Sequence, residues 1–206
     1  MTMRINTISL RKTIGLLGMS LAWIVVFLIG YFPESISATY YTNASTVFTG
    51  ILFWASGILI CYKGYEPIDD ILLTCTGIAG FGICLFPCSI TAEHEKVGTF
   101  LIDNQASNIL HCVFAVIFFV LLSYNSLFLF TKSDGEITPR KKARNVIFRV
   151  CGIGMLAAFA LLLIPNWRIK TWFTEMVALS FFGISFLTKA NVYPWLFCDS
   201  KQRVEG

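Results

Sequence analysis

Two ionisable side chains inside apolar segments, His111 and Glu175, are the residues of this sequence best placed to do chemistry. Each lies roughly one helical turn inside an apolar segment, where insertion scales assign a charged group a cost of about 2.5–3.5 kcal/mol. Residues of this kind usually face a protein interior and often mark a functional site. We therefore expect His111 and Glu175 to lie at the same membrane face and to approach each other.

Other polar residues are expected at the same face, notably Ser37, Tyr41 and Asn108. A serine, a histidine and a carboxylate together suffice for a hydrolase triad, and histidine with carboxylates suffices for a metal site. No spacing in the sequence fixes either geometry. Three interpretations stay open: a pocket for a lipid head group or small ligand, a catalytic site, and a structural hydrogen bond between His111 and Glu175.

Several motifs that would indicate a cofactor or a known catalytic centre are absent. The sequence has no HExxH, no GxSxG, no GxxxxGK[ST] and no dinucleotide fingerprint. It also lacks an HxxxH pair, which argues against a zinc hydrolase of the alkaline ceramidase type. We therefore expect neither a metal nor a cofactor.

The composition is that of an integral membrane protein. Hydrophobic residues make up 56% of the 206 residues and charged residues only 14%, whereas soluble domains carry roughly 25% charged residues. Because a span needs about 20 apolar residues, the chain holds six spans in a single domain, 1–206, without a separate soluble domain. The net charge of +4 does not require a nucleic-acid partner.

The apolar segments predict an all-α bundle of six transmembrane helices. No segment alternates with period two, which excludes a membrane β-barrel, so helices are the remaining way to satisfy the backbone in lipid. The predicted spans cover residues 13–32, 46–62, 70–90, 108–131, 146–165 and 172–192.

The distribution of Lys and Arg predicts the orientation. With both termini cytoplasmic, the outer loops hold only Lys96, Arg168 and Lys170, so 13 of the 16 basic residues lie inside. Such a bias follows the positive-inside rule. The basic inner loop 132–145 is either a determinant of this topology or a binding surface for anionic lipid. In a bacterium the protein would lie in the inner membrane.

Packing features can also be predicted. On the fourth segment, residues 111, 115, 118, 122 and 125 are spaced 4, 3, 4, 3, which places His111 and Asn125 on one helical face that should point at other helices. Glycines such as Gly77 and Gly152 should allow close helix approach. Pro87 should kink the third helix near its outer end.

Arg149 lies inside the fifth segment and requires a partner. The nearest plausible carboxylates are Asp69 and Asp70, at the inner end of the third segment. Because a lone buried guanidinium is costly, we expect Arg149 to form a structural ion pair with one of them.

A weak resemblance accompanies these patterns. Pro33-Glu-Ser-Ile-Ser37 follows the first segment, Asn104 and Asn108 precede His111, and Thr174-Glu175 begins the sixth segment, which continues to Phe186-Leu-Thr188. In these features and in span number the chain resembles the six-span proteins of the Frag1/DRAM/Sfk1 type and their bacterial relatives. The resemblance implies a lipid-linked role and no particular reaction, with Ser37, His111 and Glu175 as the matching positions.

Taken with the residues, this predicts a membrane protein that binds or organises membrane lipids through an outward-facing polar pocket. The alternative is an intramembrane hydrolase acting on a lipid.

Overall fold

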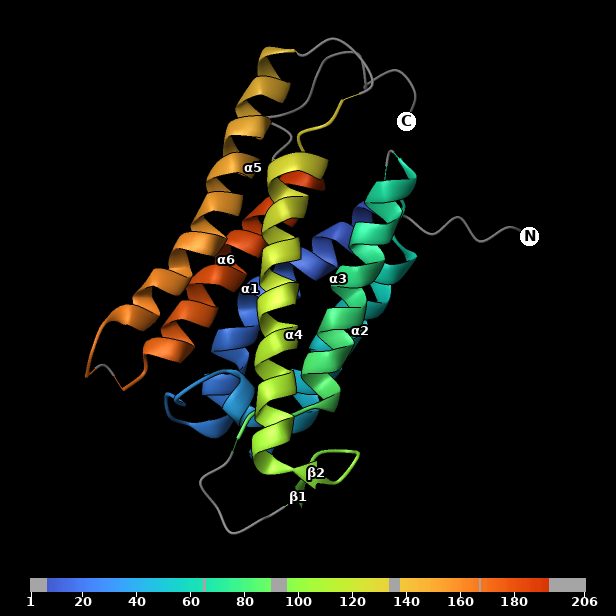
Figure 1. Cartoon of the computed structure of the whole chain (residues 1–206). Helices are drawn as coiled ribbons and strands as arrows, with labels where there is room; N and C mark the ends of the chain where they lie inside the picture. Colours follow the sequence, from blue (N-terminus) through green and yellow to red (C-terminus); the bar gives the residue numbers. More distant parts are fainter. Residues whose placement is uncertain (1–6, 65, 90–95, 134–137, 167, 193–206) are drawn as a thin grey trace.

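The computed structural model describes residues 7–64, 66–89, 96–133, 138–166 and 168–192, which form a bundle of antiparallel helices (Figure 1). The long helices are α1 (Thr7–Ile29), α2 (Ser45–Cys61), α3 (Pro67–Leu85), α4 (Asn104–Tyr124), α5 (Pro139–Ala158) and α6 (Lys170–Lys189). A π-helix, η2 (Asn125–Leu129), continues α4, and 3₁₀-helices form η1 (Ser37–Tyr41) and η3 (Phe159–Leu163). Strands β1 (Lys96–Val97) and β2 (Ile102–Asp103) make one small antiparallel hairpin.

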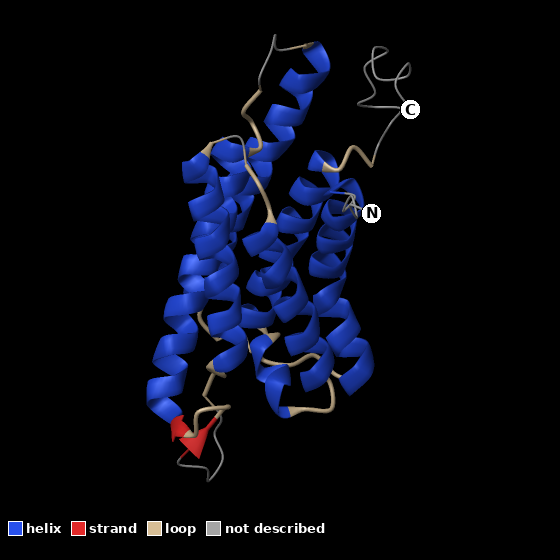
Figure 2. Cartoon of the chain, turned by 90° about the vertical axis from the view of Figure 1, so that its right-hand side faces the viewer, coloured by secondary structure: helices blue, strands red, loops and turns tan. Residues whose placement is uncertain are grey.

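The two ends of the bundle differ, and we name them by their contents. Figure 2 shows the β-hairpin (red) at one end of the helices, called the hairpin end. The opposite end is called the basic end. Among the described residues it carries Arg11, Lys12, Lys63, Lys132, Arg140, Lys141, Lys142, Arg144 and Lys189. The chain ends, residues 1–6 and 193–206, lie outside the described residues, so their predicted position is not addressed by the structure.

The helices have the length and composition expected of membrane spans. In the described part of the chain, five helical stretches are long and apolar enough to cross a membrane: Ile8–Ile29, Pro67–Leu85, Asn104–Leu129, Pro139–Leu163 and Lys170–Lys189. The remaining long helix, α2 (Ser45–Cys61), is apolar but has only 17 residues. Its length is therefore about 26 Å at 1.5 Å per residue.

Most helices start earlier than the apolar segments do, because their first turns are polar. The α5 helix begins at Pro139 rather than residue 146, with the Thr138 hydroxyl accepting a hydrogen bond from the Lys141 amide at 3.2 Å. Similarly, α3 begins at Pro67 behind a capping box formed by Glu66 and Asp69. Such caps satisfy backbone amides that the first helical turn leaves unpaired.

Pro87 ends α3 instead of kinking it, which corrects the prediction of a third helix running to residue 90. The helix stops at Leu85, and Phe86 is extended at φ −113° and ψ 96°. Proline disfavours the α conformation in the residue before it. The Phe86 amide still donates to the Gly82 carbonyl at 3.0 Å, but the carbonyl groups of residues 86–89 lie beyond the helix and need other partners.

The helices form a ring that follows chain order and closes between α1 and α6. Closure depends on two glycines: a Cβ added to Gly183 would lie 2.6 Å from the Gly15 carbonyl oxygen. The predicted close approach at Gly77 is also present, since a Cβ there would lie 2.5 Å from the Ser56 carbonyl oxygen. Both helix pairs thus pack backbone to backbone, as small residues allow.

Packing around the ring is uneven, and the weaker seams divide it into two halves. Contacts are extensive within α2–α3–α4 and within α5–α6–α1, but less so between α1 and α2 and between α4 and α5. In Figure 1, α5 leans away from α4 toward the hairpin end. The predicted inward stripe on α4 is confirmed, because His111, Phe118, Leu122 and Asn125 are all buried.

Candidate functional site

A cavity of about 430 Å³ lies at the hairpin end where α4 and α5 diverge. Its walls come from α4, α6, η3 and the irregular segments before η1 and after α3. Four of the predicted site residues line it, namely Ser37, Asn108, His111 and Glu175. The structure therefore brings these four side chains together around one cavity.

Glu175 is held by the segment that leads into η1. Its carboxylate accepts hydrogen bonds from the Ile36 amide and, at 3.4 Å, from the Ser37 hydroxyl. The backbone supports this approach, because the Trp172 amide of α6 donates to the Glu34 carbonyl at 2.9 Å. No described Lys, Arg or His forms an ion pair with Glu175, so neutral donors alone stabilise the carboxylate.

His111 bonds to the backbone freed by Pro87. Its Nδ1 lies 2.8 Å from the Phe86 carbonyl oxygen. A carbonyl oxygen can only accept, so Nδ1 carries the proton and Nε2 of the neutral ring is the acceptor. The histidine therefore replaces the helical hydrogen bond that Phe86 would otherwise have accepted.

Three more side chains secure the same four-residue segment. The Ser107 hydroxyl donates to the Pro87 carbonyl at 2.8 Å, and the Ser89 amide donates to Asn108 Oδ1 at 3.0 Å. The Tyr41 hydroxyl donates to the Cys88 carbonyl at 2.7 Å. Burial raises the pKa of Tyr41 to about 12, which keeps this phenol a donor at neutral pH.

The predicted direct pair between His111 and Glu175 is not formed. Both are described, both line the cavity, and each bonds to a different irregular segment. The physical reason is that α4 and α6 have little direct contact, while residues 33–37 and 86–89 offer unpaired backbone groups close to each side chain. Tyr41 lies at the edge of this network and does not line the cavity.

Several residues at or beside the cavity were not predicted as site residues from the sequence. The Thr174 hydroxyl lines the cavity and is buried, with no hydrogen-bond partner among the residues that the structure describes. Thr171, Thr174 and Glu175 have the i, i+3, i+4 spacing of one helical face, a signal that would have pointed to Thr174. Ser107 similarly precedes His111 by four residues. By contrast, nothing in the sequence distinguishes the cavity-lining Cys88, whose thiol has its pKa raised to about 12 by burial.

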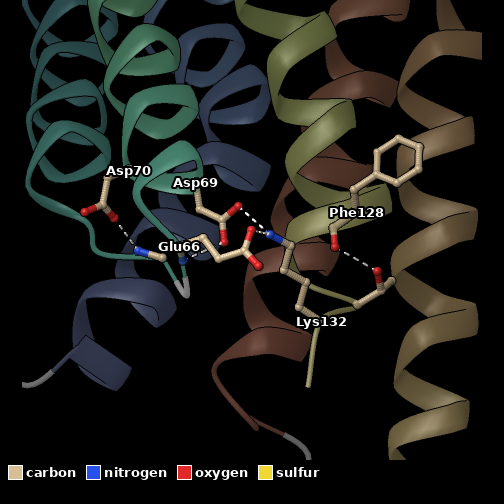
Figure 3. Close-up of polar contacts among 7 residues, drawn as sticks. Glu66, Asp69, Asp70, Phe128 and Lys132 are labelled. Atoms are coloured by element: carbon tan, nitrogen blue, oxygen red, sulfur yellow. Dashed lines mark hydrogen bonds and ion pairs between the residues drawn. The ribbon is translucent and has the colours of Figure 1, made fainter. Parts of the chain in front are cut away.

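The predicted ion pair of Arg149 is wrong. Asp69 Oδ1 pairs with Lys132 Nζ at 2.7 Å and Asp70 Oδ2 with Lys63 Nζ at 3.0 Å, as Figure 3 shows for Asp69 and Lys132. Glu66 also contacts Lys132 at 2.9 Å, and these carboxylates raise the pKa of the Lys132 ammonium group. Arg149 is exposed on α5, and an exposed guanidinium does not require the carboxylate partner that a buried one would.

The arrangement does not reproduce a hydrolase triad. In such a triad the nucleophile bonds to the base, and the base bonds to the carboxylate. Here Ser37 bonds to Glu175 directly, and His111 bonds to a backbone carbonyl. Among the described residues, no group of three or more His, Cys, Asp and Glu side chains is arranged to hold a metal ion.

Comparison of the chain with protein-family models, curated proteins and solved structures gave no match. The resemblance to proteins of the Frag1/DRAM/Sfk1 type therefore stays an expectation from the sequence.

Proposed function

We propose that this chain is a six-span membrane protein that binds a membrane lipid in the cavity at the hairpin end. The observation that carries the proposal is the position of this cavity at the seam where α4 and α5 diverge. A cavity at such a seam can admit a ligand sideways from the lipid phase.

The lining of the cavity has a polar part and an apolar part, which suits an amphiphilic ligand. Hydroxyl and carboxylate groups gather at the hairpin end, whereas Ala115, Val116, Phe119, Phe159 and Leu162 form an apolar wall. Val116 is 55% exposed on the outer surface of α4, so the wall continues onto the surface that would face lipid. The volume of about 430 Å³ falls in the range of roughly 300–1,000 Å³ typical of ligand pockets.

A second, apolar cavity extends the site inward. It has a volume of about 40 Å³ and shares Ser37, Ala115, Phe119 and Glu175 with the larger one. We infer that the head group lies at the hairpin end and an acyl chain lies along α4. The described lining includes Glu34 and Glu175 but no Lys or Arg, which favours a head group that donates hydrogen bonds or carries positive charge.

The proposed topology follows from the charges. With the basic end cytoplasmic, the positive-inside rule is obeyed, and the lipid site opens toward the outer leaflet. In a bacterial cell this places the protein in the inner membrane. Hydrolysis of the lipid is less well supported than binding, because Ser37 and His111 do not bond to each other.

The test is to fill the cavity and measure bound lipid. Ala115→Phe should lower the phospholipid that co-purifies with the protein in detergent severalfold, as quantified by mass spectrometry, because the larger ring would occupy the site. Val120→Phe is the matched control, since Val120 lies on the same helix, is 48% exposed and does not line the cavity. Equal lipid content in wild type and both variants would overturn the proposal.

A further inference from the structure

The basic end contains a separate cavity of about 190 Å³ between α1, α5, α6 and the segment after η2. This volume is several times the roughly 30 Å³ that one water molecule occupies in the liquid. Five of its described lining residues are cations, namely Arg11, Lys132, Lys141, Arg144 and Lys189, and none is Asp or Glu. The cavity is therefore unlike the one at the hairpin end in both position and charge.

Lys141 is the most unusual of these cations, because it is only 8% exposed. Its ammonium group donates to the carbonyl oxygens of Phe130 at 3.0 Å and Lys132 at 2.8 Å. An ammonium has three donors, and no described carboxylate forms an ion pair with this one. Buried charges are usually paired, so an anion in this cavity would complete the partners of Lys141.

Other groups around this cavity are also incompletely satisfied. Arg144 donates to Asn191 Oδ1 at 3.0 Å, a neutral acceptor. Arg11 lies over the Tyr62 ring at 5.0 Å, and its Nε is buried without a hydrogen-bond partner among the described residues. The Thr188 hydroxyl lines the cavity, is 1% exposed and likewise bonds to no group in the described part of the chain. Buried polar atoms without partners are rare in proteins, and each requires an explanation.

The described carboxylates at this end, Glu66, Asp69 and Asp70, are engaged with other lysines or with a lysine at the cavity edge. Asp69 and Glu66 contact Lys132 (Figure 3), and Asp70 contacts Lys63. Arg11, Lys141 and Arg144 form no ion pair with any of the described carboxylates. Lys189, whose ammonium lies 5.3 Å from the centre of the Phe130 ring, adds a further positive charge beside the cavity.

The geometry points to a binding site for a phosphate group in this cavity, with Arg11, Lys141 and Arg144 as the charged donors and Thr188 as the neutral one. A phosphate monoester carries about −1.5 to −2 charges at neutral pH, and its oxygens accept several hydrogen bonds from arginine and lysine at once. The group can belong to an anionic lipid head group or to a soluble phosphate. Either source supplies the acceptors that these side chains lack.

The experiment measures the Tm of the purified full chain in detergent as inorganic phosphate replaces chloride at constant ionic strength. A ligand that binds the folded state raises the Tm. A parallel arm compares nanodiscs of phosphatidylcholine with and without phosphatidic acid. Arg144→Gln should weaken the response to the active anion about tenfold or more, the effect expected from losing a charged hydrogen bond.

Arg149→Gln is the control, because it removes the same charge from the same helix at an exposed position outside the cavity. It should retain the wild-type response within about twofold. If Arg144→Gln fails to fold, Arg11→Gln replaces it. A response to phosphate assigns a soluble ligand, and a response to phosphatidic acid alone assigns a lipid. No response to either anion in the wild type, or equal losses in Arg144→Gln and Arg149→Gln, would overturn the site.

Discussion

Polar side chains at the hairpin end bond mainly to backbone, whereas those at the basic end include ion pairs between side chains as well as the buried Lys141, which bonds to two backbone carbonyls. The hairpin end contains irregular segments, and His111, Asn108 and Ser107 supply partners for residues 86–89. At the basic end, helices α3 and α5 begin with their own caps, so their first turns do not depend on the long cationic side chains. A polar residue in an apolar segment therefore indicates a function only after the backbone near it has been accounted for.

Among the stability changes that distinguish the two ends of the bundle, the largest is expected on substitution of His111. His111→Ala should lower the free energy of unfolding by about 1–3 kcal/mol, because it leaves the Phe86 carbonyl without its donor. Chemical denaturation in detergent is the measurement. His111→Gln keeps an N–H donor and should lose less; equal losses in the two variants would contradict a role in hydrogen bonding.

At the basic end, the corresponding effect is expected at Asp69. Asp69→Ala should lower the free energy of unfolding by about 1–2 kcal/mol through loss of the capping box alone. The neighbouring Asp70→Ala should cost less, because Asp70 pairs with an exposed lysine. Denaturation curves of both variants test this. A larger loss of unfolding free energy in Asp70→Ala than in Asp69→Ala would contradict the prediction that the capping box contributes more to stability than the Asp70–Lys63 pair.

A smaller change in stability should appear at alkaline pH, and it should involve only the ion pairs of the basic end. Contacts with Asp69 and Glu66 raise the pKa of Lys132 above its ordinary value of 10.5. Its stabilising contribution is therefore complete below about pH 10.5 and is lost as the pH rises through the higher folded-state value. The stability difference between wild type and Lys132→Gln should shrink over that range in pH-dependent thermal melts. A difference that is constant with pH would argue against the ion pair.

The smallest effect concerns coupling within the hairpin end. A double-mutant cycle of His111→Ala and Glu175→Gln should give a coupling energy below about 0.5 kcal/mol, because the two side chains share no hydrogen bond. A coupling energy above 1 kcal/mol, on the order expected for residues in one network, would show that the two side chains interact.

Apolar segments predicted the all-α fold well, because lipid-compatible helices must be long and hydrophobic. They located helix ends poorly, since Pro67 and Pro139 begin helices in polar sequence that hydrophobicity does not detect. Cap signals at Glu66 and Thr138 would have corrected both starts.

For the site, the predicted depth of His111 and Glu175 in their segments and their predicted membrane face were sufficient to place both residues at one cavity. The sequence could not predict that His111 and Glu175 form no direct hydrogen bond. This outcome depends on where Pro87 ends α3 and on how α4 and α6 are spaced around the ring. The misassigned partner of Arg149 has the same origin. Lys132 follows η2, and its closeness to Asp69 depends on how α3 and η2 pack together.

The closure of the ring between Gly15 and Gly183 has a consequence for biogenesis. The first helix is complete at Ile29, but its main packing partner does not begin until Lys170. At a synthesis rate of about 5–20 residues per second, the roughly 140 intervening residues take on the order of 10–30 seconds to emerge. During that interval the glycine face of α1 has no protein to pack against. The nascent chain must shelter that face in lipid or against the insertion machinery until its last helix arrives.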